Sequence, residues 1–311
     1  MKRTVAALLA LTAAAAASIL FALLQGSVPV GIGDVWNALL GRDAGLAGTL
    51  LVELRLPRAL TAFVTGGMLA LAGALMQVLL RNPLADPYIL GISGGAWLHL
   101  GAFAGALLSM TLVFGLARGS GAWTPLRLLL TGVVVAAGWG AVISLLLSLT
   151  PDQGLRGMLF WLMEDLSAAA SPLGGLLWLA LGLGASLPLA RHLNVLAHGE
   201  LLAGSLGVAV APLRLGVYVI ASLLAAGAVT MAGSVGFIGL VTPHLLRLSL
   251  GADHRLLLPA AVLLGGALLV LADTLARTVL APQQLPVGAV TALLGVPLFL
   301  YLLHGDRRSL R

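Results

Sequence analysis

A long apolar stretch without a single charge, from Ala59 to Leu80, constrains this chain more than any other feature. Arg58 and Arg81 flank it, and a loop with two prolines follows at 82–87. Roughly 20 consecutive apolar residues are enough for a helix to cross the hydrocarbon of a bilayer. The stretch therefore predicts a transmembrane helix with a structured loop behind it.

Similar runs recur along the whole chain, which is 60% hydrophobic and only 9% charged. A soluble domain has about 25% charged residues, so most of this surface must face lipid or protein. The composition predicts an all-α polytopic membrane protein, with residues 1–311 in one domain and 1–25 as a first span rather than a cleaved signal. The apolar runs are 4–25, 59–80, 94–117, 126–149, 172–190, 213–231, 234–250, 256–280 and 286–303.

Both termini are basic, with Lys2 and Arg3 at the start and three arginines from position 307 onward. Because cytoplasmic loops carry the excess of lysine and arginine, both ends are predicted to lie in the cytoplasm. That arrangement needs an even number of crossings, whereas the runs number nine. Region 88–117, which fits either one span or two, is the expected source of the difference.

The charge pattern excludes several classes of function. The net charge of +6 comes from basic residues that stand singly at the ends of apolar runs, so it forms no nucleic-acid patch. Lys2 is the only lysine, and a Walker A loop needs a lysine on the nucleotide phosphates. Any ATP that drives this protein must bind another chain. With no cysteine, disulfides and thiolate metal sites are excluded.

Two arginines, Arg55 and Arg58, precede the 59–80 run and are predicted to lie outside the membrane, against the positive-inside trend. Arginine suits bidentate pairing with carboxylates, so one interpretation is a docking site for an acidic partner. The other is snorkelling at a helix end. Arg277 follows Asp273 by four residues, so it either pairs with Asp273 or joins the same docking surface.

A glycine-bounded segment, 199–207, lies between apolar runs on the predicted cytoplasmic side. Short helices broken by glycine suit a compact element, within 191–212, that transmits motion to a partner. An ordinary loop is the alternative. The candidate coupling residues are Gly199, Glu200, Leu202, Ala203, Leu206 and Gly207.

Glycines and a proline also fall within or beside the predicted spans, where broken helices occur if neighbours or cavities satisfy the freed backbone. They indicate the wall of a translocation path. Gly73 and Gly233 stand at the same spacing before a proline. This weak internal similarity would be explained if the protein were built from two repeated halves. Candidate path and helix-break residues are Gly73, Gln77, Asn82, Pro83, Ser93, Gly236, Gly239 and Pro243.

Two other classes of function remain open. The sequence Gly91-Ile92-Ser93-Gly94 is similar to the nucleophile motif of rhomboid intramembrane proteases, which would require His99 or His244 as the base for Ser93. An ion-coupled secondary transporter would usually place ionisable residues deep in its spans, and almost none lie there. His244 has no second ligand at helical spacing, so we predict no metal site.

Taken in order, the motifs closely resemble the FecCD-type permease subunits of ABC importers for iron-siderophores, haem and cobalamin, over about 52–303. The matching blocks are RLPR at 55–58, AGALMQ at 72–77, NPLADP at 82–87, LGISGGA at 90–96, GELLAGSLG at 199–207, GFIGLVTPHLLRL at 236–248, DHRLLLP at 253–259, LADTLAR at 271–277 and QLPVGAVTALLGVP at 284–297.

The resemblance implies a type II importer bundle of about nine to ten transmembrane helices built from inverted repeats. It implies a homodimer in the plasma (inner) membrane of a prokaryote. Two ATPase subunits, with ATP and Mg, would bind the cytoplasmic face, and a periplasmic or lipid-anchored substrate-binding protein would dock outside. Arg55, Arg58 and Arg277 match the docking arginines, and 199–207 matches the coupling helices. The chain itself would be no enzyme and hold no cofactor; which chelate it carries stays open.

The sequence departs from the family pattern in two places. Between Gly95 and Ala117 it is shorter by about one span, or roughly 20 residues. After Trp161, where relatives usually carry small residues, it has Glu164 and Asp165. These carboxylates would repel anionic siderophores or attract a cationic ligand at the outer mouth, or they form a solvated helix end.

Overall fold

The computed structural model describes residues 2–26, 28–42, 45–82, 96–118, 124–151, 166, 172–233 and 235–306. In these ranges every element of three or more residues is helical. The elements are α1 (Lys2–Leu24), α2 (Ile32–Leu39), α3 (Gly45–Leu50), the π-helical turn η1 (Leu51–Arg55), α4 (Leu56–Leu80), α5 (Ala96–Arg118), α6 (Pro125–Leu149), α8 (Pro172–Ser186), the 3-10 turn η4 (Leu187–Leu189), α9 (Ala190–Leu196), α10 (Glu200–Ser205), α11 (Val210–Ala232), α12 (Ile238–Leu250), α13 (His254–Thr278) and α14 (Val287–Asp306).

Each predicted apolar run becomes a helix in the structure. Within the described ranges, six helices are long and apolar enough to span a membrane. Two more, α5 and α14, have 23 and 20 residues. By contrast, α12 has only 13, about 20 Å at 1.5 Å per residue, which is less than the ~30 Å of hydrocarbon. The run at 234–250 is therefore a second candidate for the apolar run that does not cross the membrane. The first candidate was region 88–117, in which residues 96–117 form the single helix α5.

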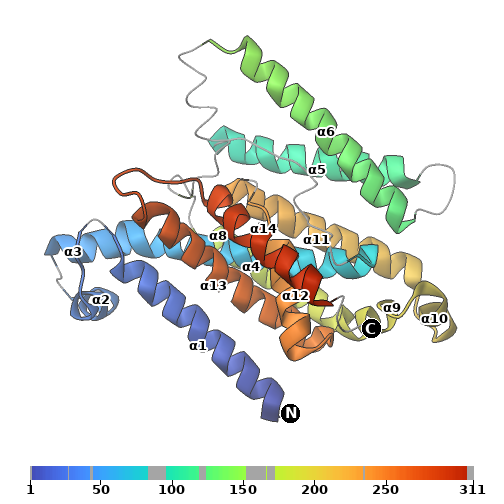
Figure 1. The fold of residues 1–311 in the computed structure, drawn as a ribbon, viewed down its shortest axis with the longest axis horizontal. Coiled ribbons are helices and arrows are strands. Elements are labelled where there is room, and N and C mark those ends of the chain that lie inside the picture. Colours follow the sequence, from blue (N-terminus) through green and yellow to red (C-terminus); the bar gives the residue numbers. More distant parts are fainter. Residues whose placement is uncertain are drawn as a thin grey trace.

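Helix α4 forms the centre of the bundle. Its residues lack charge from Ala59 to Leu80, and 20 of its 25 residues are buried. Helices α13, α11, α12, α8 and α1 all pack against it, and Figure 1 shows it running through the middle of the molecule. Because its whole circumference is apolar, it is buried on all sides rather than on one face.

Small residues allow two very close helix contacts on α4. Gly66 lies against Gly265 of α13: a methyl group on Gly265 would lie 2.6 Å from the Gly66 carbonyl oxygen. Gly73 lies against Gly239 of α12, where a methyl group would lie 2.6 Å from the Gly239 carbonyl carbon. Such contacts are typical of membrane helices, which associate by close backbone approach.

The two ends of α4 carry different elements. At its start lie η1, α2, α3 and the C-terminal end of α1; at its end lie α9 and α10 (Figure 1). The start of α1 and the end of α14 both point toward the α9–α10 side in this view. This arrangement separates the predicted outer and cytoplasmic residues along one central helix.

Candidate functional site: two surfaces at opposite ends of α4

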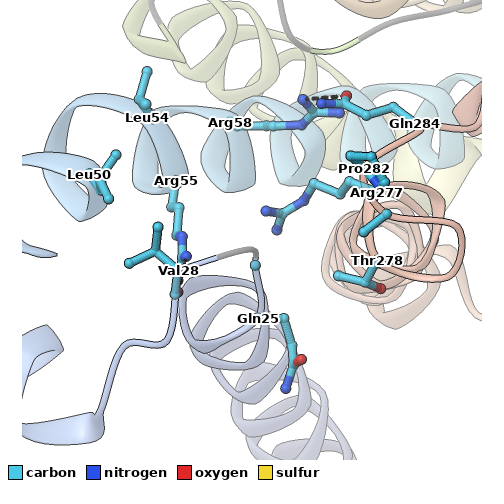
Figure 2. A pocket seen from close by; sticks show the side chains of 12 residues that line it. Gln25, Val28, Leu50, Leu54, Arg55, Arg58, Arg277, Thr278, Pro282 and Gln284 are labelled. Atoms are coloured by element: carbon cyan, nitrogen blue, oxygen red, sulfur yellow. Dashed lines mark hydrogen bonds between the residues drawn. The ribbon is translucent and has the colours of Figure 1, made fainter.

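The predicted docking arginines line one pocket at the start of α4. It has a volume of about 510 Å³ and is lined by residues from the end of α1, from α3 to α4 and from the end of α13 onward. Arg55, Arg58 and Arg277 all face it, together with Gln25 and Gln284 (Figure 2). The structure therefore brings Arg277 together with two arginines that lie more than 200 positions earlier in the sequence.

Arg55 is held by the backbone at the end of α1. Its Nη1 donates to the Leu23 carbonyl at 2.8 Å and its Nη2 to the Val28 carbonyl at 2.6 Å. The last carbonyls of a helix have no intrahelical partner and carry the negative end of its dipole, which explains the Leu23 acceptor; Val28 lies in the segment after α1. Arg55 is only 8% exposed, so it forms part of the pocket wall.

Arg58 and Arg277 share one buried carboxylate. Arg58 Nη2 lies 2.8 Å from Asp273 Oδ1, and its Nε lies 3.1 Å from both carboxylate oxygens. Arg277 Nε lies 3.3 Å from Asp273 Oδ2, and its Nη2 donates to the Ala22 carbonyl at 3.0 Å. The predicted i,i+4 pair of Asp273 and Arg277 is present, and Arg58 joins it from α4.

The balance of charge around this pocket is positive. Three guanidinium groups line the pocket, two of them pair with the single Asp273 carboxylate, and the other polar side chains of the lining are neutral. Arg58 Nη1 also reaches Gln284 Oε1 at 3.3 Å, the dashed contact in Figure 2. An excess of two positive charges in a pocket with exposed amides at its rim is suited to receive carboxylates.

The predicted coupling segment forms two short helices at the other end of α4. Helix α10 spans six residues and begins after Gly199, whose φ of +117° is a conformation that residues with a side chain rarely adopt. Gly207, with a φ of +80°, ends the segment. Leu201 is 93% exposed and Leu206 63%, while Ala203 is fully buried. The part at 199–207 is thus one compact helix, α10, with an exposed apolar side.

Ion pairs connect α10 to two long helices. Glu200 Oε1 accepts from Arg81 Nη2 at 2.8 Å and from Arg214 Nη1 at 2.9 Å. Arg81 directly follows α4, in the left-handed region at φ 47°, and Arg214 lies on α11. One carboxylate therefore joins three elements at the predicted cytoplasmic end.

Helix α9 has its own link, to the start of α13. Asn194 Nδ2 donates to Asp253 Oδ1 at 2.8 Å, and the His254 backbone N–H donates to Asn194 Oδ1 at 2.9 Å. The bond from Asn194, helped by the backbone N–H of Arg255, lowers the pKa of the Asp253 carboxyl below its usual value. Asp253 is thus held ionised at the positive N-terminal end of α13.

Several predicted path residues meet between α4 and α12. Pro243 lies inside α12 without ending it. Because proline has no N–H, the Gly239 carbonyl four residues earlier lacks its helical donor, and Gln77 Nε2 approaches it at 3.4 Å and the Leu240 carbonyl at 3.1 Å. Gln77 in turn accepts from Arg247 of α12.

The true break lies earlier, at 233–237. Gly233 ends α11 with a φ of +71°, and Phe237, with a φ of +68°, precedes α12; Gly236 lies between them. Gly73, by contrast, lies mid-helix in α4, so the equal spacing of Gly73 and Gly233 before a proline does not reflect equal local structure. Asn82 closes α4 through its backbone N–H to the Gln77 carbonyl.

Some sequence predictions fall outside the described residues: those on Pro83, Ser93, Glu164 and Asp165. His244, one of the two candidate protease bases, is buried on α12 and packs edge-on against Phe299. Among the side chains that the structure describes, no three His, Asp or Glu groups gather as a metal site would require.

Sequence reasoning missed Asp273 as a shared partner and missed Arg81 and Arg214 altogether. A signal for the last two existed: Glu200 is the only acidic residue from 166 to 252, and an arginine within an apolar run such as 210–232 needs a counter-charge. What the sequence does not reveal is that Arg81, more than 100 positions away, reaches the same carboxylate.

Comparison with known proteins places these features in context. The model of the FecCD transport family matches residues 14–101 and 96–305. The two matched stretches overlap at 96–101, within the region 95–117 where the sequence was expected to be shorter than the family pattern.

Named relatives match nearly the full length. The hemin transport system permease protein HmuU of Yersinia pestis is 42% identical over 288 residues, covering 83% of this chain and 84% of the relative. The vitamin B12 import system permease protein BtuC of Vibrio cholerae is 38% identical, covering 89% of each. The Fe(3+) dicitrate transport system permease protein FecD of Escherichia coli is 37% identical, covering 96% and 98%.

A solved structure also matches closely. It is an inward-facing conformation of a transporter described as an ABC transporter of metal-chelate type, with a TM-score of 0.81 and 30% identity, covering 96% of this chain and 98% of that one.

Proposed function

Because this chain belongs to the FecCD transport family, we propose that it is the membrane-spanning permease subunit of an ABC importer that carries a metal chelate into the cytoplasm. It is a multi-pass transport subunit and not an enzyme. The observation that carries the proposal is the pair of surfaces at opposite ends of α4: an arginine pocket at the end predicted to lie outside and a short exposed helix at the end predicted to lie inside. Relatives named for haem, vitamin B12 and ferric dicitrate support the class of cargo.

The partners follow from these two surfaces. The inner surface, 191–212 with its exposed leucines, would receive an ATPase subunit. That subunit would bind ATP and Mg, because this chain has no lysine for a Walker A loop. The outer pocket would receive acidic side chains of a substrate-binding protein. Helix α6, whose apolar residues are largely exposed in a single copy, suits contact with lipid or with a second copy in a homodimer. Relatives from bacteria support a prokaryotic inner membrane.

Reconstituted into liposomes with its ATPase and binding protein, the chain should accumulate cargo only when ATP is present. Haemin, cobalamin and a ferric hydroxamate serve as parallel probes, and uptake is measured by the radioactive metal or spectroscopically. The chain alone, under a proton or sodium gradient, is the control and should transport none of them. Gradient-driven uptake by the chain alone would instead establish the secondary-transporter alternative.

Adding negative charge to the outer pocket should weaken docking of the binding protein. Gln25→Glu and Gln284→Glu change exposed rim residues without breaking the Asp273 pairs. Each should lower affinity by about fivefold at low salt, the effect of roughly 1 kcal/mol for an exposed charge pair. The effect should shrink at 1 M salt, where the Debye length falls to about 3 Å.

The matched control is Asn37→Asp, the same amide-to-acid change on α2, outside the pocket lining. Binding is measured by surface plasmon resonance on the permease in nanodiscs at several salt concentrations. Equal affinity of the parent and both glutamate variants at every salt concentration would remove the docking role from this pocket.

A further inference from the structure

Helix α10 cannot hold its position by itself. It has six residues, and isolated helices shorter than about 12 residues are marginal in water. Its three leucines, Leu201, Leu202 and Leu206 at its end, are exposed, and Ala203 is its one buried residue. A single buried methyl group is a weak anchor, so the polar contacts of Glu200 must account for much of its fixed orientation.

Those contacts come from two helices with very different surroundings. The side chain of Arg214 is 8% exposed and belongs to α11, whereas that of Arg81 is 41% exposed and follows the last residue of α4. Both guanidinium groups contact the same oxygen, Glu200 Oε1. The carboxylate thus bridges α11 and α4 through α10.

The two halves of this bridge should differ in strength. An ion pair shielded from water is screened little and is costly to break, whereas exposed pairs typically contribute only 0–1 kcal/mol. Breaking the contact of Glu200 with Arg214 should therefore cost more free energy than breaking its contact with Arg81.

We propose that Arg81 and Arg214 are positioning residues for α10: Arg214 fixes the helix to α11, and Arg81 passes its movement to α4. The proposal rests on the proposed function, in which α10 receives the ATPase. Helix α4 is buried along its length and carries Arg58 of the docking pocket at its other end. A change at the inner surface therefore reaches the outer one through one helix, and by thermodynamic linkage the reverse also holds.

The first test uses the chain alone. Because it has no cysteine, Leu201→Cys gives a single site for a nitroxide label on the exposed side of α10. Glu200→Gln and Arg214→Ala should each increase the mobility of the label, seen as a sharper electron paramagnetic resonance spectrum. Arg42→Ala, which removes an exposed arginine after α2 and outside the lining of the arginine pocket, is the control and should leave the spectrum unchanged. Identical spectra for Glu200→Gln and the parent would overturn the proposal.

The second test uses the assembled complex in nanodiscs. Arg81→Ala should lower the ratio of ATP hydrolysis with loaded binding protein to hydrolysis without it, by about fivefold, the low end of typical coupling effects. Arg81→Lys, which keeps the charge, should restore part of the ratio, and Arg42→Ala should retain all of it. A parental ratio in Arg81→Ala would show that α4 does not receive the movement through Arg81.

The two tests separate this proposal from the proposed function. If the parent chain binds no ATPase, the proposed function fails, yet the nitroxide spectra of the chain alone still decide whether Glu200 holds α10. If the complex forms and transports cargo, but these substitutions change neither the nitroxide spectra nor the stimulation ratio, only the positioning role fails.

Discussion

The variant Gly73→Ala is expected to unfold at a markedly lower temperature than the parent protein. Its added methyl group would lie 2.6 Å from the carbonyl carbon of Gly239 and 2.7 Å from its Cα. Both are backbone atoms, so no side chain can rotate away and α12 itself must shift. Overpacking typically costs about 1–3 kcal/mol, and a clash with backbone belongs at the upper end of that range, which corresponds to a fall of roughly 6 °C or more in the unfolding midpoint.

The matched control is Gly184→Ala on α8, where a methyl group meets nothing within 4 Å. Alanine is favoured over glycine in a helix by up to about 1 kcal/mol, so this variant should be unchanged or slightly more stable. Scanning fluorimetry in detergent, with size-exclusion chromatography to detect aggregation, gives both midpoints. Equal midpoints for Gly73→Ala and the parent would mean that α4 and α12 are not in contact at this point.

Removing the carboxylate of Asp273 should destabilise the protein by about 3 kcal/mol or more, because breaking a buried ion pair leaves uncompensated charge. Asp273 has 2% of its side chain exposed and serves both Arg58 and Arg277. In Asp273→Ala the two guanidinium groups would face each other with only backbone carbonyls and Gln284 as acceptors. Asp273→Asn, which keeps an acceptor oxygen, should lie between the parent and the alanine variant.

Glu53→Ala provides the control, since it removes an exposed acidic side chain from η1, two residues before Arg55. Its free energy of unfolding should match that of the parent within about 0.5 kcal/mol. If Asp273→Ala is as stable as Glu53→Ala, the shared carboxylate contributes nothing to the fold, and the positive pocket must be held together by its backbone contacts alone.

The helices themselves could be predicted from the sequence, because length and lack of charge decide whether a segment crosses a bilayer. The run at 59–80 became α4, and the run at 256–280 became α13 with nearly the same limits. The run at 234–250 was wrong at its start, since Gly233 and Phe237 take left-handed conformations and α12 begins only at Ile238. Single-residue backbone choices of this kind leave no trace in hydropathy.

The candidate sites were harder to predict than the spans. The resemblance to the family pointed to Arg55, Arg58 and Arg277, and the structure places all three around one pocket. Their partners could not be foreseen, because the carbonyls of Leu23 and Val28 lie 32 and 27 residues from Arg55. Backbone acceptors have no sequence signature, and so the arginines looked more available than they are.

The fixed arginines around the outer pocket have a kinetic consequence. Arg55, Arg58 and Arg277 are already bound to carbonyls and to Asp273 before any partner arrives, so little rotamer freedom remains to be lost on contact. The hydrogen-bond donors would therefore be preorganised before a binding protein docks. The association rate should then be high and governed by long-range electrostatic attraction. The dissociation rate should depend on how well the loops of the binding protein are ordered.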